Sequence, residues 1–158
     1  MDYLTGLLQN KILLSAAIGW AFAQVIKTII DFAFNKKVNF ERLVGSGGMP
    51  SCHSATVCAL ATSSAITCGT ASSEFAISFI LAIIVMYDAR GVRRETGTQA
   101  VVLNQIIEFF KRPDNVEKFK FEFDHKRLKE LVGHTPLQVT CGGLTGIAVA
   151  IIVCNFIL

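Results

Sequence analysis

Four apolar segments take up most of the chain, at residues 12–34, 54–68, 75–87 and 137–158. Hydrophobic residues make up 52% of the 158 residues and the mean hydropathy is +0.51, which is too apolar for an ordinary soluble domain of this size. A helix of about 20 apolar residues spans a hydrocarbon core ~30 Å thick, and the first and last segments have that length. The two shorter middle segments flank a small polar turn and predict a helical hairpin. The sequence therefore predicts an all-α, polytopic membrane helical bundle, a single domain over residues 1–158 with about four transmembrane helices.

The long polar region before the last segment begins with a helical pattern over residues 97–110. Its apolar residues fall mostly on one helical face, and its polar residues fall elsewhere. The apolar set is Val101, Val102, Leu103, Ile106, Ile107 and Phe110, and the polar set is Gln99, Asn104, Gln105 and Glu108. This pattern predicts an amphipathic helix at the membrane interface.

Basic residues are concentrated in two segments, 35–53 and 88–136, which contain thirteen of the fifteen Lys and Arg residues. With four spans, both segments lie on the same side of the membrane, and the positive-inside rule makes them cytoplasmic loops. The first apolar segment has no basic n-region and no cleavage site of small residues, so we expect it to remain as a membrane helix. The sequence thus predicts an integral protein of a plasma membrane or an organellar inner membrane, with its basic loops on the cytoplasmic or equivalent side.

Composition argues against two classes of function. The basic residues alternate with long apolar runs and do not interleave with exposed aromatics on a polar domain, so we expect no nucleic-acid partner. The five cysteines have no CxxC spacing, and four of them lie in apolar runs, where Cys behaves as a small hydrophobic residue. We therefore expect no metal site and no redox role.

The loop GGMPSCHSA, residues 47–55, has the composition of an anion-binding helix start. Its glycines allow a sharp turn, Pro50 suits a helix start, and Ser51 or Ser54 can cap the helix that follows. Unpaired N–H groups and the helix dipole attract an anion there, and His53 would lie beside that anion as a proton donor. A capped membrane helix with an interfacial histidine and no ligand fits the same residues.

Further candidates for a phosphate site lie on the predicted cytoplasmic side. His134 stands just before the last span, on the same predicted side as His53. Lys27 lies inside the first span, where an ionisable residue either snorkels to the interface or points into a polar site. Arg42, Arg93 and Arg94 either bind phosphate oxygens through charge-assisted hydrogen bonds or act as positive-inside anchors.

Three stretches together resemble the divergent branch of the type-2 phosphatidic acid phosphatase superfamily, which also contains the vanadium haloperoxidases. They are GGMPSCHSA, VMYDARGVRRETGTQAVVLNQ and LKELVGHTPLQV. The resemblance runs from about Gln24 to Ile147. It implies a helical protein that hydrolyses phosphate esters without metal or cofactor.

The resemblance also implies roles for individual residues. His134 matches the nucleophile and His53 the acid that protonates the leaving group. Phosphate would be bound by the loop and by basic side chains, namely Lys27, Arg42, Gly48, Ser51, Cys52, Arg93 and Arg94.

The sequence departs from the wider superfamily at several motif positions. Cys52 occupies a glycine position, and the third-motif arginine has no match in register. Gln138 stands where a carboxylate would orient and charge-stabilise the histidine; a neutral amide can orient it but not neutralise it. Asp88, at the end of the third span, is a second candidate for orienting the histidine.

The sequence-based hypothesis is a metal-independent phosphatase acting on a lipid phosphomonoester or diphosphate through a phosphohistidine intermediate. The alternative is a catalytically weak or inactive membrane protein that binds phospholipid headgroups, which Gln138 favours. A transporter would need more intramembrane polar groups than these spans supply. A cysteine phosphatase using Cys52 would need an arginine-bearing loop after the thiol, and none follows.

Two questions stay open at the level of sequence. The lipid-facing residues are generic, so they do not select one lipid phosphate. The small residues Gly142, Gly143 and Gly146 would let another helix approach closely, either within one chain or between two copies in a homo-oligomer.

Overall fold

Every element in the described part of the chain is a helix. The computed structural model describes residues 3–36, 48–110 and 134–157, and it contains no strand among them. The helices are α1 (Tyr3–Leu8), α2 (Lys11–Asn35), α4 (Cys52–Cys68), α5 (Ser73–Arg90), α6 (Val92–Phe110) and α7 (Pro136–Ile152), followed by a short π-helix, η2 (Val153–Ile157). The predicted all-α class is confirmed.

The main helices begin at small polar residues that cap them. The side chains of Asn10, Ser51, Ser72 and Thr135 accept hydrogen bonds from the backbone N–H three residues later, at the starts of α2, α4, α5 and α7. Such caps satisfy N–H groups that have no partner inside the helix. The apolar segments of the sequence therefore become helices that start close to the predicted positions.

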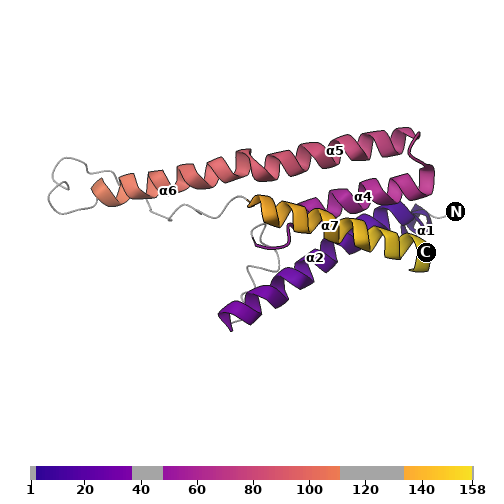
Figure 1. Ribbon diagram of the computed structural model, residues 1–158, viewed down its shortest axis with the longest axis horizontal. Coiled ribbons are helices and arrows are strands. Elements are labelled where there is room, and N and C mark those ends of the chain that lie inside the picture. The colour runs from indigo at the N-terminus through magenta and orange to yellow at the C-terminus, as the bar shows by residue number, and fades with distance from the viewer. Residues whose placement is uncertain (1–2, 37–47, 111–133, 158) are drawn as a thin grey trace.

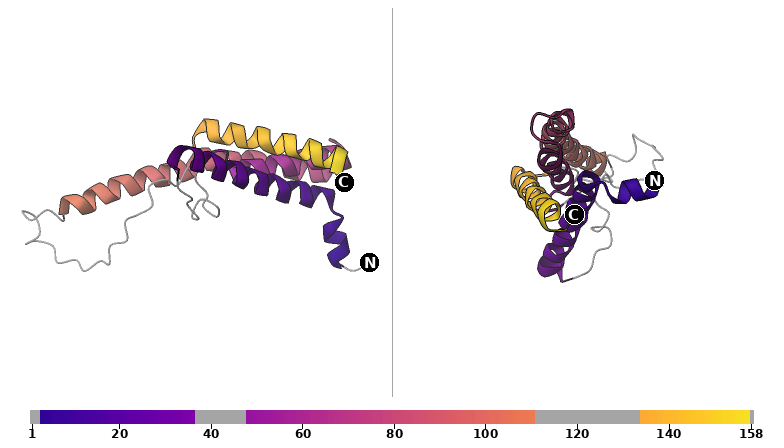
Figure 2. Two further views of the ribbon diagram at one scale, coloured as in Figure 1. Left: turned by 90° about the horizontal axis from the view of Figure 1, so that it is seen from below. Right: turned by 90° about the vertical axis from the view of Figure 1, so that its right-hand side faces the viewer.

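Helix α4 lies at the centre, and α2, α5 and α7 pack around it (Figure 1). Both chain termini lie at one end of the bundle (Figure 2). At the opposite end lie the start of α4, the end of α5 and the start of α7, and the last turns of α2 diverge from them (Figure 1). Residues 35, 53, 88 and 136, which bound the two basic segments, belong to these helix ends.

The centre of the bundle is built from small side chains. Ala23, Cys52 and Ala55 form one buried cluster. A Cβ atom on Gly146 would overlap the backbone of Ala55, and one on Gly142 would overlap the backbone of Ser51, so α7 lies directly against α4. Close approach through small residues is the usual way in which membrane helices pack. These two glycines therefore serve packing within one chain.

Large apolar side chains point outward. Ile29, Ile77 and Leu144 are 61%, 70% and 67% exposed, and the same holds for many Phe, Leu and Ile side chains on α2, α5 and α7. An apolar exterior around a core of Ala, Gly, Ser and Cys is the arrangement expected when lipid covers the outside.

Three helical stretches are long and apolar enough to cross a membrane: Lys11–Asn35, Ser73–Phe109 and Pro136–Phe156. Helix α4, predicted as the second span, is shorter at 17 residues and rich in Ser and Thr. Its serines are buried, and Ser63 and Ser64 donate to the carbonyls of Ala59 and Leu60. Because three other helices pack against α4, it does not need the lipid-facing hydropathy of the others.

The predicted amphipathic helix is present and longer than expected, since α6 starts at Val92 and not at residue 97. Gly91 separates it from α5, and the two helices lie nearly in line, so that α6 extends beyond the rest of the bundle (Figure 1). Val102, Leu103, Ile106 and Phe109 are exposed on it. Its position at the membrane interface stays a prediction.

Candidate functional site

The two histidines singled out in the sequence lie next to each other. His53 is the second residue of α4, and His134 lies two residues before the start of α7. Their ring centroids are 6.2 Å apart, and the rings are tilted by 59°. His134 is buried and His53 is half-buried. Both imidazoles are therefore close enough to reach one small group at this end of the bundle.

Backbone contacts between three helices hold the histidines in place. The N–H of Ser51, at the start of α4, donates to the carbonyl of Gln138 in α7 at 3.0 Å. The N–H of His134 donates to the carbonyl of Ala89 in α5 at 3.2 Å. The first contact depends on Gly142, because a side chain there would overlap the backbone of Ser51. The starts of α4 and α7 and the end of α5 are thus fixed together.

Gln138 orients the ring of His134. Its Oε1 atom lies 3.2 Å from Nδ1 of His134 and also accepts the N–H of Thr135 at 3.0 Å. Because an amide oxygen can only accept, the hydrogen-bond pattern assigns the proton to Nδ1 of His134. The neutral ring then carries its lone pair on Nε2. This is the tautomer that a nucleophilic histidine requires.

The role of Gln138 in this arrangement is also visible in the sequence. Thr135 and Gln138 form a capping box, in which each side chain accepts from the backbone of the other. The spacing Thr-x-x-Gln before an apolar run is a known signature of that motif. The capping role of Gln138 was therefore predictable from this spacing, although its place at the carboxylate position alone does not indicate it.

Lys27 points into the protein and does not snorkel. It is only 1% exposed, and its Nζ donates to the Sγ of Cys52 at 3.7 Å. The same sulfur lies 3.8 Å from Nδ1 of His53. The Lys27 ammonium therefore contacts the Cys52 thiol, and this thiol contacts the His53 imidazole, at the start of α4. A buried cation in a membrane helix usually marks a functional site.

The loop before α4 has the backbone geometry that its composition predicts. Gly48 has a φ of +101°, in the region that favours glycine. Ser51 is fully buried, and its Oγ accepts the N–H of Ser54 at 3.4 Å and the hydroxyl of Ser54 at 3.1 Å. Because the Ser51 oxygen accepts both of these hydrogen bonds, its own O–H can donate to a third group.

The other predicted site residues are placed only in part. Asp88 is half-buried near the end of α5, next to the residue whose carbonyl receives the His134 N–H. Arg42 lies outside the described residues, and so do the side chains of Arg93 and Arg94 on the first turn of α6. The described residues thus bring together Lys27, Cys52, His53, His134 and Gln138.

Metal ligation was also tested in the described part of the chain. Within residues 3–36, 48–110 and 134–157, no three His, Cys, Asp or Glu side chains gather in a way that could hold a metal ion. The expectation of a site without metal stays a prediction.

Comparison with known proteins places this chain among membrane proteins. A family model described as the divergent PAP2 family matches residues 8–149, a range that includes all the site residues named above. The chain is 45% identical to the uncharacterized membrane protein YuiD of Bacillus subtilis (strain 168), over 95% of this chain and 98% of that protein. No solved structure matches. The match over most of the chain shows that this protein belongs to the divergent PAP2 family.

Proposed function

We propose that the protein is a metal-independent phosphatase that acts on a lipid phosphomonoester or diphosphate at the membrane interface, through a phosphohistidine intermediate. The observation that carries the proposal is the pair of imidazoles 6.2 Å apart, at the start of α4 and beside a buried lysine. Two histidines with different surroundings can divide nucleophilic and acid–base roles between them. Membership of the divergent PAP2 family supports a phosphatase-related role.

His134 acts as the nucleophile in this scheme. Its Nε2 lone pair attacks phosphorus, and a P–N bond forms while the bond from phosphorus to the leaving oxygen breaks. The Nδ1–H bond to Gln138 holds the ring in the required tautomer throughout.

His53 acts as the general acid and then as the base. In its charged form it gives a proton to the departing oxygen, which leaves as an alcohol or, from a diphosphate, as a monophosphate. Neutral His53 then takes a proton from a water that attacks phosphorus, the P–N bond breaks, and phosphate is released. His134 regains its lone pair and His53 its proton, so both residues return to their starting states.

The phosphate is bound by the start of α4 and by basic side chains. A 17-residue helix presents unpaired N–H groups and a positive dipole end to an anion. The Lys27 ammonium lies at the same place, against Cys52. Gly48, Ser51 and Cys52 form the loop around the anion, and Arg42, Arg93 and Arg94 supply further positive charge in this proposal.

Phosphate release from short-chain phosphatidic acid by the purified full-length protein tests the function. We expect release by the wild-type protein, loss of release in His134→Ala, and phosphate trapped on a histidine during turnover only while His134 is present. Full activity in both His134→Ala and His53→Ala would rule the scheme out.

A second candidate function follows from Gln138. A neutral amide orients His134 but does not stabilise the positive charge that develops on the ring. The same site would then bind a phospholipid headgroup without turning it over. Saturable binding of short-chain phosphatidic acid, with no phosphate release from any lipid phosphate, would identify this function.

A further inference from the structure

One face of α4 is left uncovered by the other helices. Cys52, Ala55 and Ala59 of α4 face α2, and Val57 and Ala61 pack with Ala82 of α5. Helix α7 covers the side that includes Cys58. Among the described residues, α2 and α5 make no contact with each other. In the part of the chain that the structure describes, no helix packs across the strip of α4 that lies between them.

His53 lies on this open strip. The residues at helical spacing from it are Thr56, Leu60 and Ser64, three, seven and eleven positions later, which share one face of a helix. Eleven residues correspond to about 16 Å along the axis. The strip thus leads from the candidate site toward the far end of the bundle.

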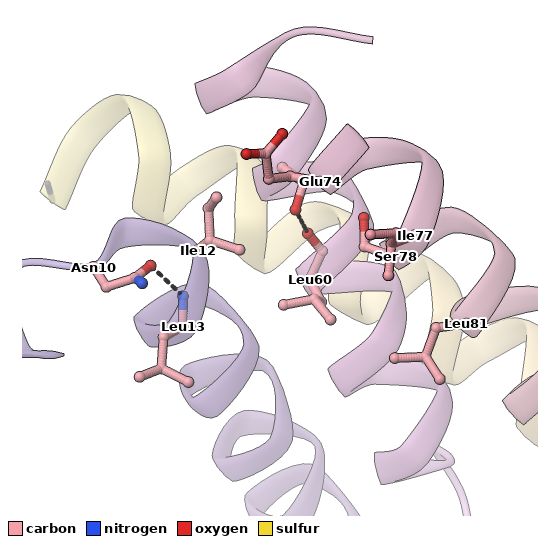
Figure 3. A pocket seen from close by; sticks show the side chains of 9 residues that line it. Asn10, Ile12, Leu13, Leu60, Glu74, Ile77, Ser78 and Leu81 are labelled. Carbon is pink, nitrogen blue, oxygen red and sulfur yellow. Dashed lines mark hydrogen bonds between the residues drawn. The ribbon is translucent and has the colours of Figure 1, made fainter. Parts of the chain in front are cut away.

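A groove of about 400 Å³ occupies the far part of the strip (Figure 3). Leu60 and Ser64 of α4 form its floor. Its walls come from α2 and from α5, namely Asn10, Ile12 and Leu13 on one side and Glu74, Ile77, Ser78 and Leu81 on the other. The groove therefore lies on the same face of α4 as His53.

Three polar side chains of the groove have hydrogen-bond partners, and a fourth, Glu74, is exposed. Ser64 donates to the carbonyl of Leu60 at 2.9 Å, and Ser78 donates to the carbonyl of Phe75 at 3.0 Å. Asn10 accepts the N–H of Leu13 at 3.0 Å (Figure 3). Hydroxyls and amides that are already hydrogen-bonded do not need a hydrogen-bond partner from a bound ligand. The groove therefore suits an apolar ligand.

One end of the strip is polar and the other is apolar, as are the headgroup and the chain of a lipid. At one end are His53 and the buried Lys27, and at the other is an apolar groove. A volume of about 400 Å³ falls in the usual range of ligand pockets, about 300–1,000 Å³, and gives room for a part of one apolar chain.

We propose that this strip and groove bind one apolar chain of a lipid phosphate whose headgroup lies at His53 and His134. The proposal rests on the proposed function and adds the place where the substrate's apolar chain binds: along α4, between α2 and α5. Short-chain esters are bound by the headgroup alone, so they are turned over with a higher KM.

Photo-crosslinking in lipid vesicles tests the position of the chain without using activity. The probe is a lipid phosphate with a diazirine in the middle of its chain, and the labelled residues are mapped by mass spectrometry. We expect labelling of Leu60, Ile77 and Leu81 that unlabelled lipid phosphate competes away and a neutral lipid of equal chain length does not. Competable labelling spread evenly onto Leu144 of α7, which faces outward, would overturn the proposal.

A pair of matched variants tests the consequence for turnover. Leu60→Trp fills the groove, whereas Leu144→Trp adds the same side chain to an outward face of α7. We expect Leu60→Trp to lower kcat/KM for a long-chain substrate about tenfold and to leave a short-chain substrate unchanged. Equal losses on both substrates, or equal effects of the two variants, would contradict the chain site.

The outcomes separate this proposal from the proposed function. Localised, competable labelling without any phosphate release would support the chain site and refute the phosphatase. Phosphate release with evenly spread labelling would support the phosphatase and refute the chain site. Conversion of a dimer to a monomer by Leu60→Trp alone would show that a second copy occupies the groove, which would also refute the chain site.

Discussion

The Oε1 atom of Gln138 accepts hydrogen bonds from two neighbours, His134 and Thr135. It fixes the tautomer of His134 and completes the cap of α7. Activity and helix stability therefore depend on the same atom, and substitutions at this position can separate the two.

We predict that Gln138→Glu increases phosphate release and that Gln138→Leu nearly abolishes it. A carboxylate keeps both hydrogen bonds and adds the negative charge that stabilises a charged imidazole, so kcat should rise about tenfold. Leucine removes the orientation of the ring, and the loss should be at least about a hundredfold. Phosphate release from short-chain phosphatidic acid measures both. A faster Gln138→Leu enzyme would show that Gln138 has no orienting role.

Lys27 gives a second prediction at the same scale. Lys27→Met keeps the length of the side chain but removes its ammonium group and the contact with Cys52, and the thermal midpoint shows whether the variant still folds. Phosphate binding should weaken about tenfold or more, because a charge-assisted hydrogen bond is lost. Lys11→Met, at the other end of α2, is the matched control and should change neither quantity. Unchanged inorganic phosphate binding in Lys27→Met would remove Lys27 from the site.

At the scale of elements, the contact between α4 and α7 positions His134 beside His53. A Cβ on Gly146 would overlap the backbone of Ala55, whereas a Cβ on Gly6 would meet open space. We predict that Gly146→Ala destabilises the protein by about 1–3 kcal/mol and lowers activity, because α7 must move away from α4 and take His134 with it. Gly6→Ala is the control. Thermal unfolding in detergent and phosphate release measure the effects, and a Gly146→Ala protein with wild-type stability would argue against this packing.

The helices themselves could be predicted, whereas their contacts could not. Long apolar runs bounded by Asn10, Ser51, Ser72 and Thr135 determine where helices start, since length and capping are local properties. Which faces meet depends on rotation about each helix axis. In helices that are apolar on nearly all sides, hydrophobic periodicity carries little information about that rotation.

The candidate site could likewise be predicted only in part. His53 and His134 stood out by their loops and by their resemblance to family motifs, and they do lie together. The contact of Lys27 with Cys52 was not expected, because it depends on how α2 is turned against α4. Helix α4 was predicted as one of the spans, but the packing of three other helices against it could not be read from its own residues.

At the scale of the whole molecule, the ends of the helices sort into two groups. Both termini lie at the end away from the histidines, and the segments with most of the basic residues connect at the histidine end (Figures 1 and 2). The positive-inside rule then predicts a cytoplasmic site and two non-cytoplasmic termini. Reporters fused before Met1 and after Leu158 check this prediction. A cytoplasmic signal from either fusion would invert or break the topology.

The alignment of α5 with α6 has a consequence for how the protein meets a bilayer. The 37 residues from Ser73 to Phe109 would form a rod about 55 Å long, nearly twice the ~30 Å thickness of the hydrocarbon core. A straight rod would carry Val102, Leu103, Ile106 and Phe109 out into water. We therefore expect a bend at Gly91, where the two helices already separate, to lay this apolar stripe on the lipid headgroups.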